Sequence, residues 1–113
     1  MTAKDIYDRA ITSLGYADDQ VFKKKAVVII NQVYDELYNS LPHIEYKPIK
    51  LLNDDVNLPN RVCTGAFVYG VAERIALGEG DGENQQYFAR QFDRAKAKIV
   101  IVDRVKDVFG GVL

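Results

Sequence analysis

The sequence has few of the residues that build reactive or metal-binding sites. It contains one cysteine, Cys63, one histidine, His43, and no tryptophan. One cysteine cannot form a disulfide within the chain, and one cysteine with one histidine is too few for the usual zinc sites. A nucleophile or general base also needs an activating partner, and neither residue has one at helical spacing. We therefore expect both residues to have packing roles, and we expect no metal and no cofactor.

Long apolar runs and a strong net charge are also missing. The longest unbroken apolar runs, residues 26–30 and 99–102, are far shorter than the roughly 20 residues that cross a bilayer. The N-terminus lacks the basic region and apolar core of a signal peptide. The net charge of −1 gives the chain as a whole no attraction to DNA or acidic membranes. These absences predict a soluble cytoplasmic protein without a membrane partner.

Helical periodicity is present, and capping residues mark where the first two helices begin. Thr2 and Asp5 match a capping box, and Gly15 suits the left-handed residue that closes a helix. A second helix is expected to begin at Asp18 or Asp19 and to run to the proline-bearing segment that follows. Both helices have one apolar face, which predicts that they dock on other helices.

A third predicted helix is apolar nearly all round. It is expected after Pro59, with Asn60 as its N-cap. Such a helix is central, buried by its own bundle or by its bundle plus a partner chain. Gly65 and Gly70 each weaken it by up to about 1 kcal/mol relative to alanine. We expect the close approach of another backbone to compensate.

A glycine-rich turn, residues 78–82, leads into a fourth helix with an aromatic face. Asp81 is placed to cap this helix, which carries Phe88 and Phe92. The turn matches neither a phosphate loop, because it follows a helix and no Lys-Ser/Thr pair follows it, nor a calcium loop, because the ligand spacing is wrong. Residues 99–102 are β-branched throughout, so a strand is an alternative there.

The segment between the second and third helices, residues 42–59, is long and unusually apolar for a loop. It holds all three prolines of the chain, and an ordered loop of this length is uncommon in a small domain unless it has a purpose. Its apolar residues either pack back on the bundle or bind another subunit. The interface candidates in this segment are Ile44, Tyr46, Ile49, Leu51, Leu52, Val56 and Leu58.

Basic residues gather near the C-terminus. Between residues 94 and 107, five basic residues outnumber two acidic ones. They form either a solvated helix exterior or a weak contact with nucleic acid or an acidic partner surface. The candidate contacts are Arg94, Lys98, Arg104 and Lys106. A second basic run, residues 23–25, has the same two interpretations.

Together these patterns predict an all-α fold, a small antiparallel bundle of about four helices with a long extended loop between the second and third. Residues 1–107 form one domain, and residues 108–113 form a tail that is flexible or ordered by a partner. The neighbouring carboxylates at residues 35–36 and 54–55 do not converge as acid/base catalysis requires. No residue is therefore assigned a catalytic role, and we expect a protein that is not an enzyme.

The central stretch resembles the small head–tail connector (adaptor) proteins of tailed bacteriophages and prophages. The resemblance spans about residues 20–100 and rests on helical and turn patterns. The pattern comprises YDELY at residues 34–38, LP at 58–59, YGVA at 69–72, ALGEGD at 76–81, and Phe88 with Phe92.

This resemblance implies a structural subunit of the virion, located at the head–tail junction and assembled in the cytoplasm of the bacterial host. It implies a homo-oligomeric ring of about a dozen subunits on the phage portal, contacts with tail-completion proteins, and only non-specific contact with the DNA in the channel. The long loop and the terminal segment, residues 100–113, would then make the ring and portal contacts. That segment adds Val105, Val108 and Phe109 to the interface candidates.

A second hypothesis comes from a different class of protein. The basic segment at residues 94–106 would also suit a small helical DNA-binding or regulatory domain. No short turn joins two helices with a polar, base-reading second helix, which counts against this hypothesis.

Overall fold

The computed structural model describes residues 1–41 and 44–108, with side chains described as far as Ile99. The chain is all-α, as the sequence predicts. Its helices are α1 (Ala3–Leu14), α2 (Gln20–Tyr38), a continuous helical segment made of α3 (Asn60–Val62), the π-helical turn η1 (Cys63–Phe67) and α4 (Val68–Gly78), and finally α5 (Gly82–Val108). Across the described residues the one β-type pairing is an isolated bridge between Thr2 and Asp55.

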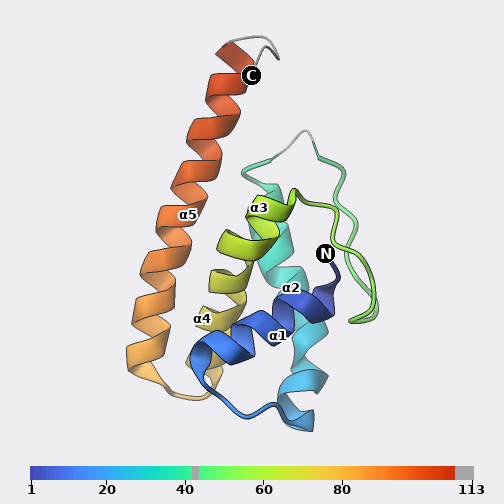
Figure 1. Ribbon diagram of the computed structural model, residues 1–113, viewed down its shortest axis with the longest axis vertical. Helices are drawn as coiled ribbons and strands as arrows, with labels where there is room; N and C mark the ends of the chain where they lie inside the picture. The colour runs from blue at the N-terminus through green and yellow to red at the C-terminus, as the bar shows by residue number, and fades with distance from the viewer. Residues whose placement is uncertain (42–43, 109–113) are drawn as a thin grey trace.

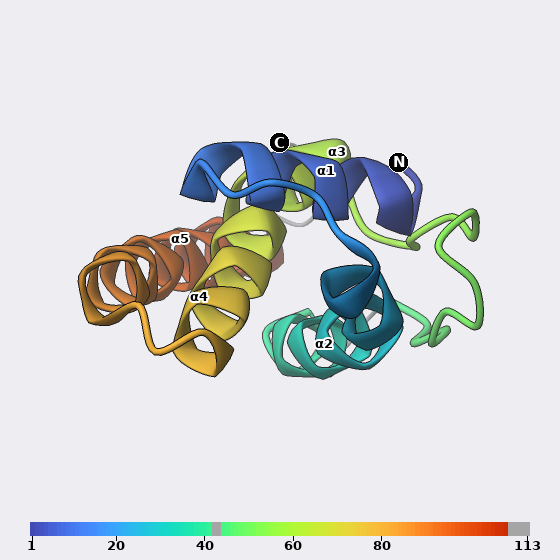
Figure 2. The same ribbon diagram turned by 90° about the horizontal axis from the view of Figure 1, so that it is seen from below.

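Three of the helical segments run along the long axis of the molecule, and α1 lies across them (Figures 1 and 2). α2 ascends in the view of Figure 1, the segment from α3 to α4 descends, and α5 ascends again. This alternation is the antiparallel arrangement expected for helices joined in sequence. α5 has 27 residues, about 40 Å of helix, and the longest dimension of the molecule is 46 Å. The backbone of α5 therefore continues beyond the helices that it packs against (Figure 1).

The capping residues determine the helix starts as predicted, with one exception. The Oγ1 of Thr2 accepts from the amide of Asp5, whose carboxylate accepts in return from the amide of Thr2. Asp19 caps α2 by accepting from a first-turn amide, and Asp81 does the same for α5. The predicted cap at Asn60 is wrong. Pro59 occupies the N-cap position, and no side chain caps this end.

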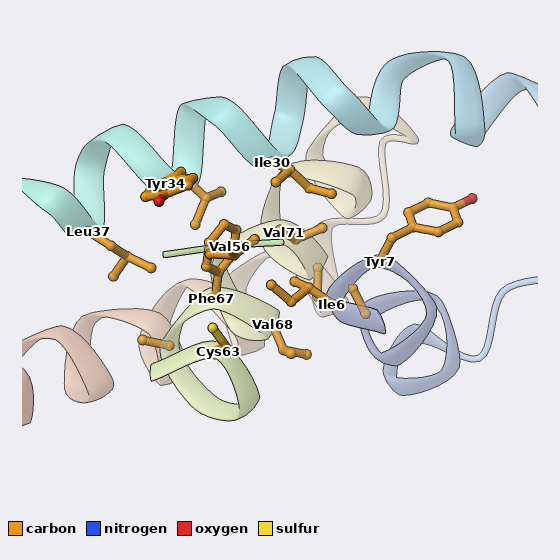
Figure 3. Packing of buried hydrophobic residues seen from close by; sticks show 14 of the residues in the cluster. Ile6, Tyr7, Ile30, Tyr34, Leu37, Val56, Cys63, Phe67, Val68 and Val71 are labelled. Atoms are coloured by element: carbon orange, nitrogen blue, oxygen red, sulfur yellow. The ribbon is translucent and has the colours of Figure 1, made fainter. Parts of the chain in front are cut away.

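The helical segment formed by η1 and α4 is the centre of the core. Figure 3 shows Phe67 and Val71 between α2 and the helical segment that carries them, and both residues are fully buried. α1 packs against α4 as well. α5 packs along another side of α4. The chain's own helices therefore cover this apolar segment, and its composition gives no evidence for a partner chain.

The two glycines of this segment have different surroundings, and the predicted close approach of a backbone is wrong for both. A Cβ at Gly70 would lie 2.7 Å from Cγ1 of Val33 and 2.9 Å from Cζ of Phe92. Side chains of α2 and α5, rather than a backbone, therefore occupy the space at Gly70. A Cβ at Gly65 would meet nothing within 4 Å. Residues 99–102, for which a strand was an alternative, belong to α5.

The loop between α2 and α3 is held by the first turn of α1. The amides of Ala3 and Lys4, which have no partner within their own helix, donate to the carbonyls of Asp54 (2.9 Å) and Leu52 (2.8 Å). The amide of Val56 donates to the carbonyl of Met1 at 2.9 Å. These bonds anchor the second half of the loop to the N-terminal end of α1.

α2 anchors the same loop from the other side. The side chain of Asn31 accepts from the amide of Ile49 (2.8 Å) and donates to its carbonyl (2.9 Å). The hydroxyl of Tyr34 accepts from the amide of Asn57 at 3.0 Å. The loop therefore has ordered contacts with two helices, although its described part, residues 44–59, forms no helix or strand.

Candidate functional site

The apolar residues of the loop divide into buried and exposed members. Ile49, Val56 and Leu58 are only 4–9% exposed and belong to the core of their own chain. Ile44, Tyr46 and Leu52 are partly buried against that core. Leu51 is 65% exposed. Of the two alternatives for this loop, packing back on the bundle therefore accounts for most of its apolar residues, and Leu51 is the member fully accessible to a partner.

The remaining candidates from the C-terminal segment fall at the edge of the described structure. The backbone of α5 includes Val105, Val108, Arg104 and Lys106, but the positions of their side chains are not described. Phe109 lies outside the described residues, as do the rest of the predicted tail and His43.

Arg94 and Lys98 lie on one edge of a surface groove, and Arg61 lies on the opposite edge. The groove runs between α5 and the segment formed by α3 and η1, and its volume is about 400 Å³. Ala66, Ala95 and Ile99 provide apolar surface within it. The full lining is Arg61, Val62, Gly65, Ala66, Tyr69, Gln91, Arg94, Ala95, Lys98 and Ile99. The structure thus brings two predicted basic contacts together with a third, Arg61, that the sequence did not indicate.

Three of the residues that line the groove are small, namely Gly65 and Ala66 on the helical segment and Ala95 on α5. Gly65 lines it and lies in the π-helical turn, a conformation that occurs often at functional sites. Since a Cβ at this position would meet nothing within 4 Å, the space beside it is open. The alanines on both walls leave similar room. Small side chains on facing helices thus produce a depression with an apolar floor.

The charge of the groove is entirely positive. None of the ten lining residues is acidic, and Arg61, Arg94 and Lys98 are all exposed. No described carboxylate lies within ion-pair distance of any of these three side chains. An apolar floor with three cations at its rim would suit a ligand that combines an apolar group with negative charge.

Lys96, which the sequence counted in the basic segment, is already paired. The carboxylate of Glu36 on α2 accepts from Lys96 on α5 and from Arg74 on α4, each at 2.7 Å. Phe92 supports both cations from below, since its ring centroid lies 4.3 Å from Nζ of Lys96 and 5.9 Å from Cζ of Arg74. This cluster joins three helices. Its role is therefore structural, and Lys96 is not among the cations that line the groove.

Protonation of Glu36 should weaken this cluster. Burial alone would raise the pKa of Glu36, but the bonds from Lys96 and Arg74 outweigh burial and hold the pKa below its ordinary value of 4.5. The contribution of a carboxylate with a lowered pKa is fully present above pH 4.5 and is lost as pH falls through the lower, folded-state pKa.

We therefore expect Glu36→Gln to reduce the free energy of unfolding by about 1 kcal/mol near neutral pH and by much less at a pH low enough to protonate Glu36 in the folded protein. Urea unfolding at both pH values measures this difference. Asp93→Asn is the matched control, because Asp93 also contacts Lys96 but is 76% exposed. An equal loss for Glu36→Gln at both pH values would contradict the ion-pair account.

The other reactive groups are in settings that favour packing. Cys63 is fully buried, and burial raises the pKa of its thiol, which keeps it in the unreactive form. Its Sγ donates to the carbonyl of Leu58 at 3.6 Å. Within residues 1–41 and 44–99, no three side chains of the metal-ligating types come together in a group that could hold an ion. Likewise, no described helix combines the length and apolar character that would let it cross a bilayer.

Comparison with known proteins gives no match for this chain among protein families, curated proteins or solved structures.

Proposed function

We propose that this protein is a structural subunit of the head–tail connector of a tailed bacteriophage or prophage. In this role it forms an oligomeric ring on the portal and continues the channel through which DNA passes. The observation that supports the proposal is the location, within the fold, of the residues that resemble connector proteins. Residues 69–72 and 76–81 form α4 and the turn that leads into α5. Much of the pattern therefore falls in the α4–α5 hairpin, and its remaining parts lie at the end of α2 and just before α3.

The contacts within this hairpin explain why those residue types are needed there. Gly70 leaves room for the ring of Phe92, and Tyr69 lies beside Phe88 with ring centroids 6.3 Å apart. Asp81 caps α5 and accepts a hydrogen bond from the hydroxyl of Tyr16. The turn is thus fixed at both of its ends, and α5 leaves it in a defined direction. A rigid helix that continues past its own bundle is suited to contacts with neighbouring subunits.

Binding to the portal tests this proposal. The purified chain is expected to co-sediment with the portal oligomer encoded in the same genome, and negative-stain images of the complex should show added density at one end of the portal. Leu51→Asp is a useful variant, because Leu51 is exposed and lies in the loop expected to make contacts. The proposal would be refuted if the chain stayed monomeric at high concentration and also did not bind the portal.

A DNA-binding or regulatory domain is the second candidate, and the groove is the observation that favours it. Arg61, Arg94 and Lys98, which lie on facing helices and pair with no described carboxylate, would suit the phosphates of a nucleic acid. Against it, α4 and α5 are joined as an antiparallel hairpin, and no described element has the geometry of a recognition helix. Mobility-shift assays over a salt series separate the two candidates, since sequence-specific binding with a steep salt dependence would favour this one.

A further inference from the structure

Among residues 1–41 and 44–99, no acidic residue lines the basic groove, but this part of the chain does carry exposed negative charge elsewhere. The α4–α5 turn, residues 78–82, follows Leu77, whose side chain is 62% exposed. Glu79 lies within the turn and Glu83 directly follows it, and both are exposed. No described cation lies within ion-pair distance of either carboxylate. An exposed leucine followed by two exposed carboxylates has the apolar surface and negative charge that would complement the groove.

The turn is held in a fixed shape before any partner arrives. Asp81 accepts hydrogen bonds from the hydroxyl of Tyr16 and from the amide and side chain of Asn84. The amide of Asp81 donates to the carbonyl of Ala76 at 3.0 Å. A preorganised turn loses little conformational entropy when it binds, which favours its use as an inserted element.

A subunit cannot insert this turn into its own groove. The turn lies at the lower end of the α4–α5 hairpin in Figure 1, whereas the groove lies beside α3, farther along α5. Arg94 lies twelve positions after Gly82 on α5, which corresponds to about 18 Å of helix. The turn and the groove of one subunit are therefore too far apart to contact each other, and only the turn of a second molecule can enter the groove.

We propose that the groove receives the α4–α5 turn of a second copy of this chain. Leu77 of that copy covers the apolar floor, and its Glu79 and Glu83 face Arg61, Arg94 and Lys98. The groove volume of about 400 Å³ lies within the range of pockets that hold ligands and is ample for one leucine side chain. Its biological setting, the ring, rests on the proposed connector function.

This contact joins two different surfaces, so it is heterologous. Each subunit then presents an empty groove on one side and an unused turn on the other. Repetition of such a contact closes into a ring when the rotation per subunit permits and otherwise extends into a filament. The ion pairs lie at an exposed rim, so the association should weaken as salt screens them.

Charge reversal tests the contact directly. Sedimentation velocity should show association of the wild-type chain at low salt, weakened about tenfold or more on going from about 0.05 M to about 0.5 M salt. The groove variant Arg94→Glu/Lys98→Glu and the turn variant Glu79→Lys/Glu83→Lys should each be monomeric. All four positions are exposed, so both variants should keep the wild-type circular dichroism, and the groove variant should keep the wild-type melting temperature. The turn variant should melt slightly lower, because Glu83 lies in the first turn of α5, where the helix dipole favours negative charge.

An equimolar mixture of the two variants should restore association, because each reversed groove then meets a reversed turn. The matched control is Lys24→Glu/Lys25→Glu, which alters net charge as much as the groove variant but on the exposed side of α2. This control should associate with itself normally. When it is mixed with the turn variant, its intact turn enters the variant's intact groove, but the variant's reversed turn cannot extend the assembly, so the control's oligomers should become shorter. Wild-type behaviour of the groove or turn variant, or no association in the mixture of these two variants, would overturn the inference.

Portal binding, measured on the same samples, separates this inference from the proposed function. A wild-type chain that is monomeric at low salt but binds the portal overturns the inference and leaves the connector function standing. A chain that associates through the groove but does not bind the portal supports the inference and counts against the connector function.

Discussion

Phe67→Ala is expected to lower the free energy of unfolding by about 3–5 kcal/mol, because it removes a large side chain from the centre of the core. Phe67 has no solvent-exposed surface. It lies between α2 and the helical segment that contains it, with its ring 5.8 Å from that of Tyr34 (Figure 3). A loss of this size is comparable to the whole stability of a small domain.

The substitution should also loosen the loop between α2 and α3. The hydroxyl of Tyr34 accepts from the amide of Asn57, and its ring contacts Tyr46 edge-on at 5.1 Å. A cavity beside Tyr34 would let this ring move and would weaken both loop contacts. Hydrogen exchange at the amide of Asn57 should therefore accelerate more than exchange in α5.

Chemical unfolding measures the energetic part of this prediction. Phe67→Leu should cost much less than Phe67→Ala, because it keeps most of the buried volume. Val28→Ala should change stability by less than about 0.5 kcal/mol, since Val28 is 59% exposed on α2. If Phe67→Ala cost no more than Val28→Ala, the position of Phe67 at the centre of the core would be wrong.

Local signals predicted the helices and most of their starts correctly. The capping box of α1 and the caps at Asp19 and Asp81 depend on residues within three positions of one another, so sequence spacing is enough to identify them. The prediction of Asn60 as an N-cap was wrong because Pro59 occupies the N-cap position and Asn60 is already the first residue of the helix. The π-helical turn had no signal, since it adds one residue to a helix without changing its composition.

Features that depend on tertiary placement were less predictable. The loop pattern could not separate Ile49, which is buried, from Leu51, which is exposed, because alternation in a loop does not say which side faces the bundle. Arg61 joined the groove only when α3 and α5 were placed side by side. Lys96 and Arg94 are two residues apart on α5, yet Lys96 pairs with Glu36 and Arg94 does not. Residue types in a basic segment therefore predict charge, but the partners from other helices decide which charge stays free.

Gly70→Ala is expected to reduce the free energy of unfolding by about 1–3 kcal/mol, although alanine is the better helix former. The added methyl group would lie 2.7 Å from Cγ1 of Val33 and 2.9 Å from Cζ of Phe92. α2 and α5 face α4 at this point, so either a side chain must leave its rotamer or a helix must shift. Movement of Phe92 would also disturb Lys96, whose ammonium lies over its ring.

Gly65→Ala is the matched substitution in the same helical segment, and its expected effect has the opposite sign. It should raise the free energy of unfolding by up to about 1 kcal/mol, because its methyl group meets nothing within 4 Å and the helix gains propensity. A double-mutant cycle with Phe92→Leu identifies the clash. Gly70→Ala should cost less in the Phe92→Leu background, because the ring atom that the methyl group approaches is gone. If Gly70→Ala lowered the free energy of unfolding equally in both backgrounds, Phe92 would be free to move aside. The contact between Gly70 and Phe92 would then not explain the direction in which α5 leaves the hairpin.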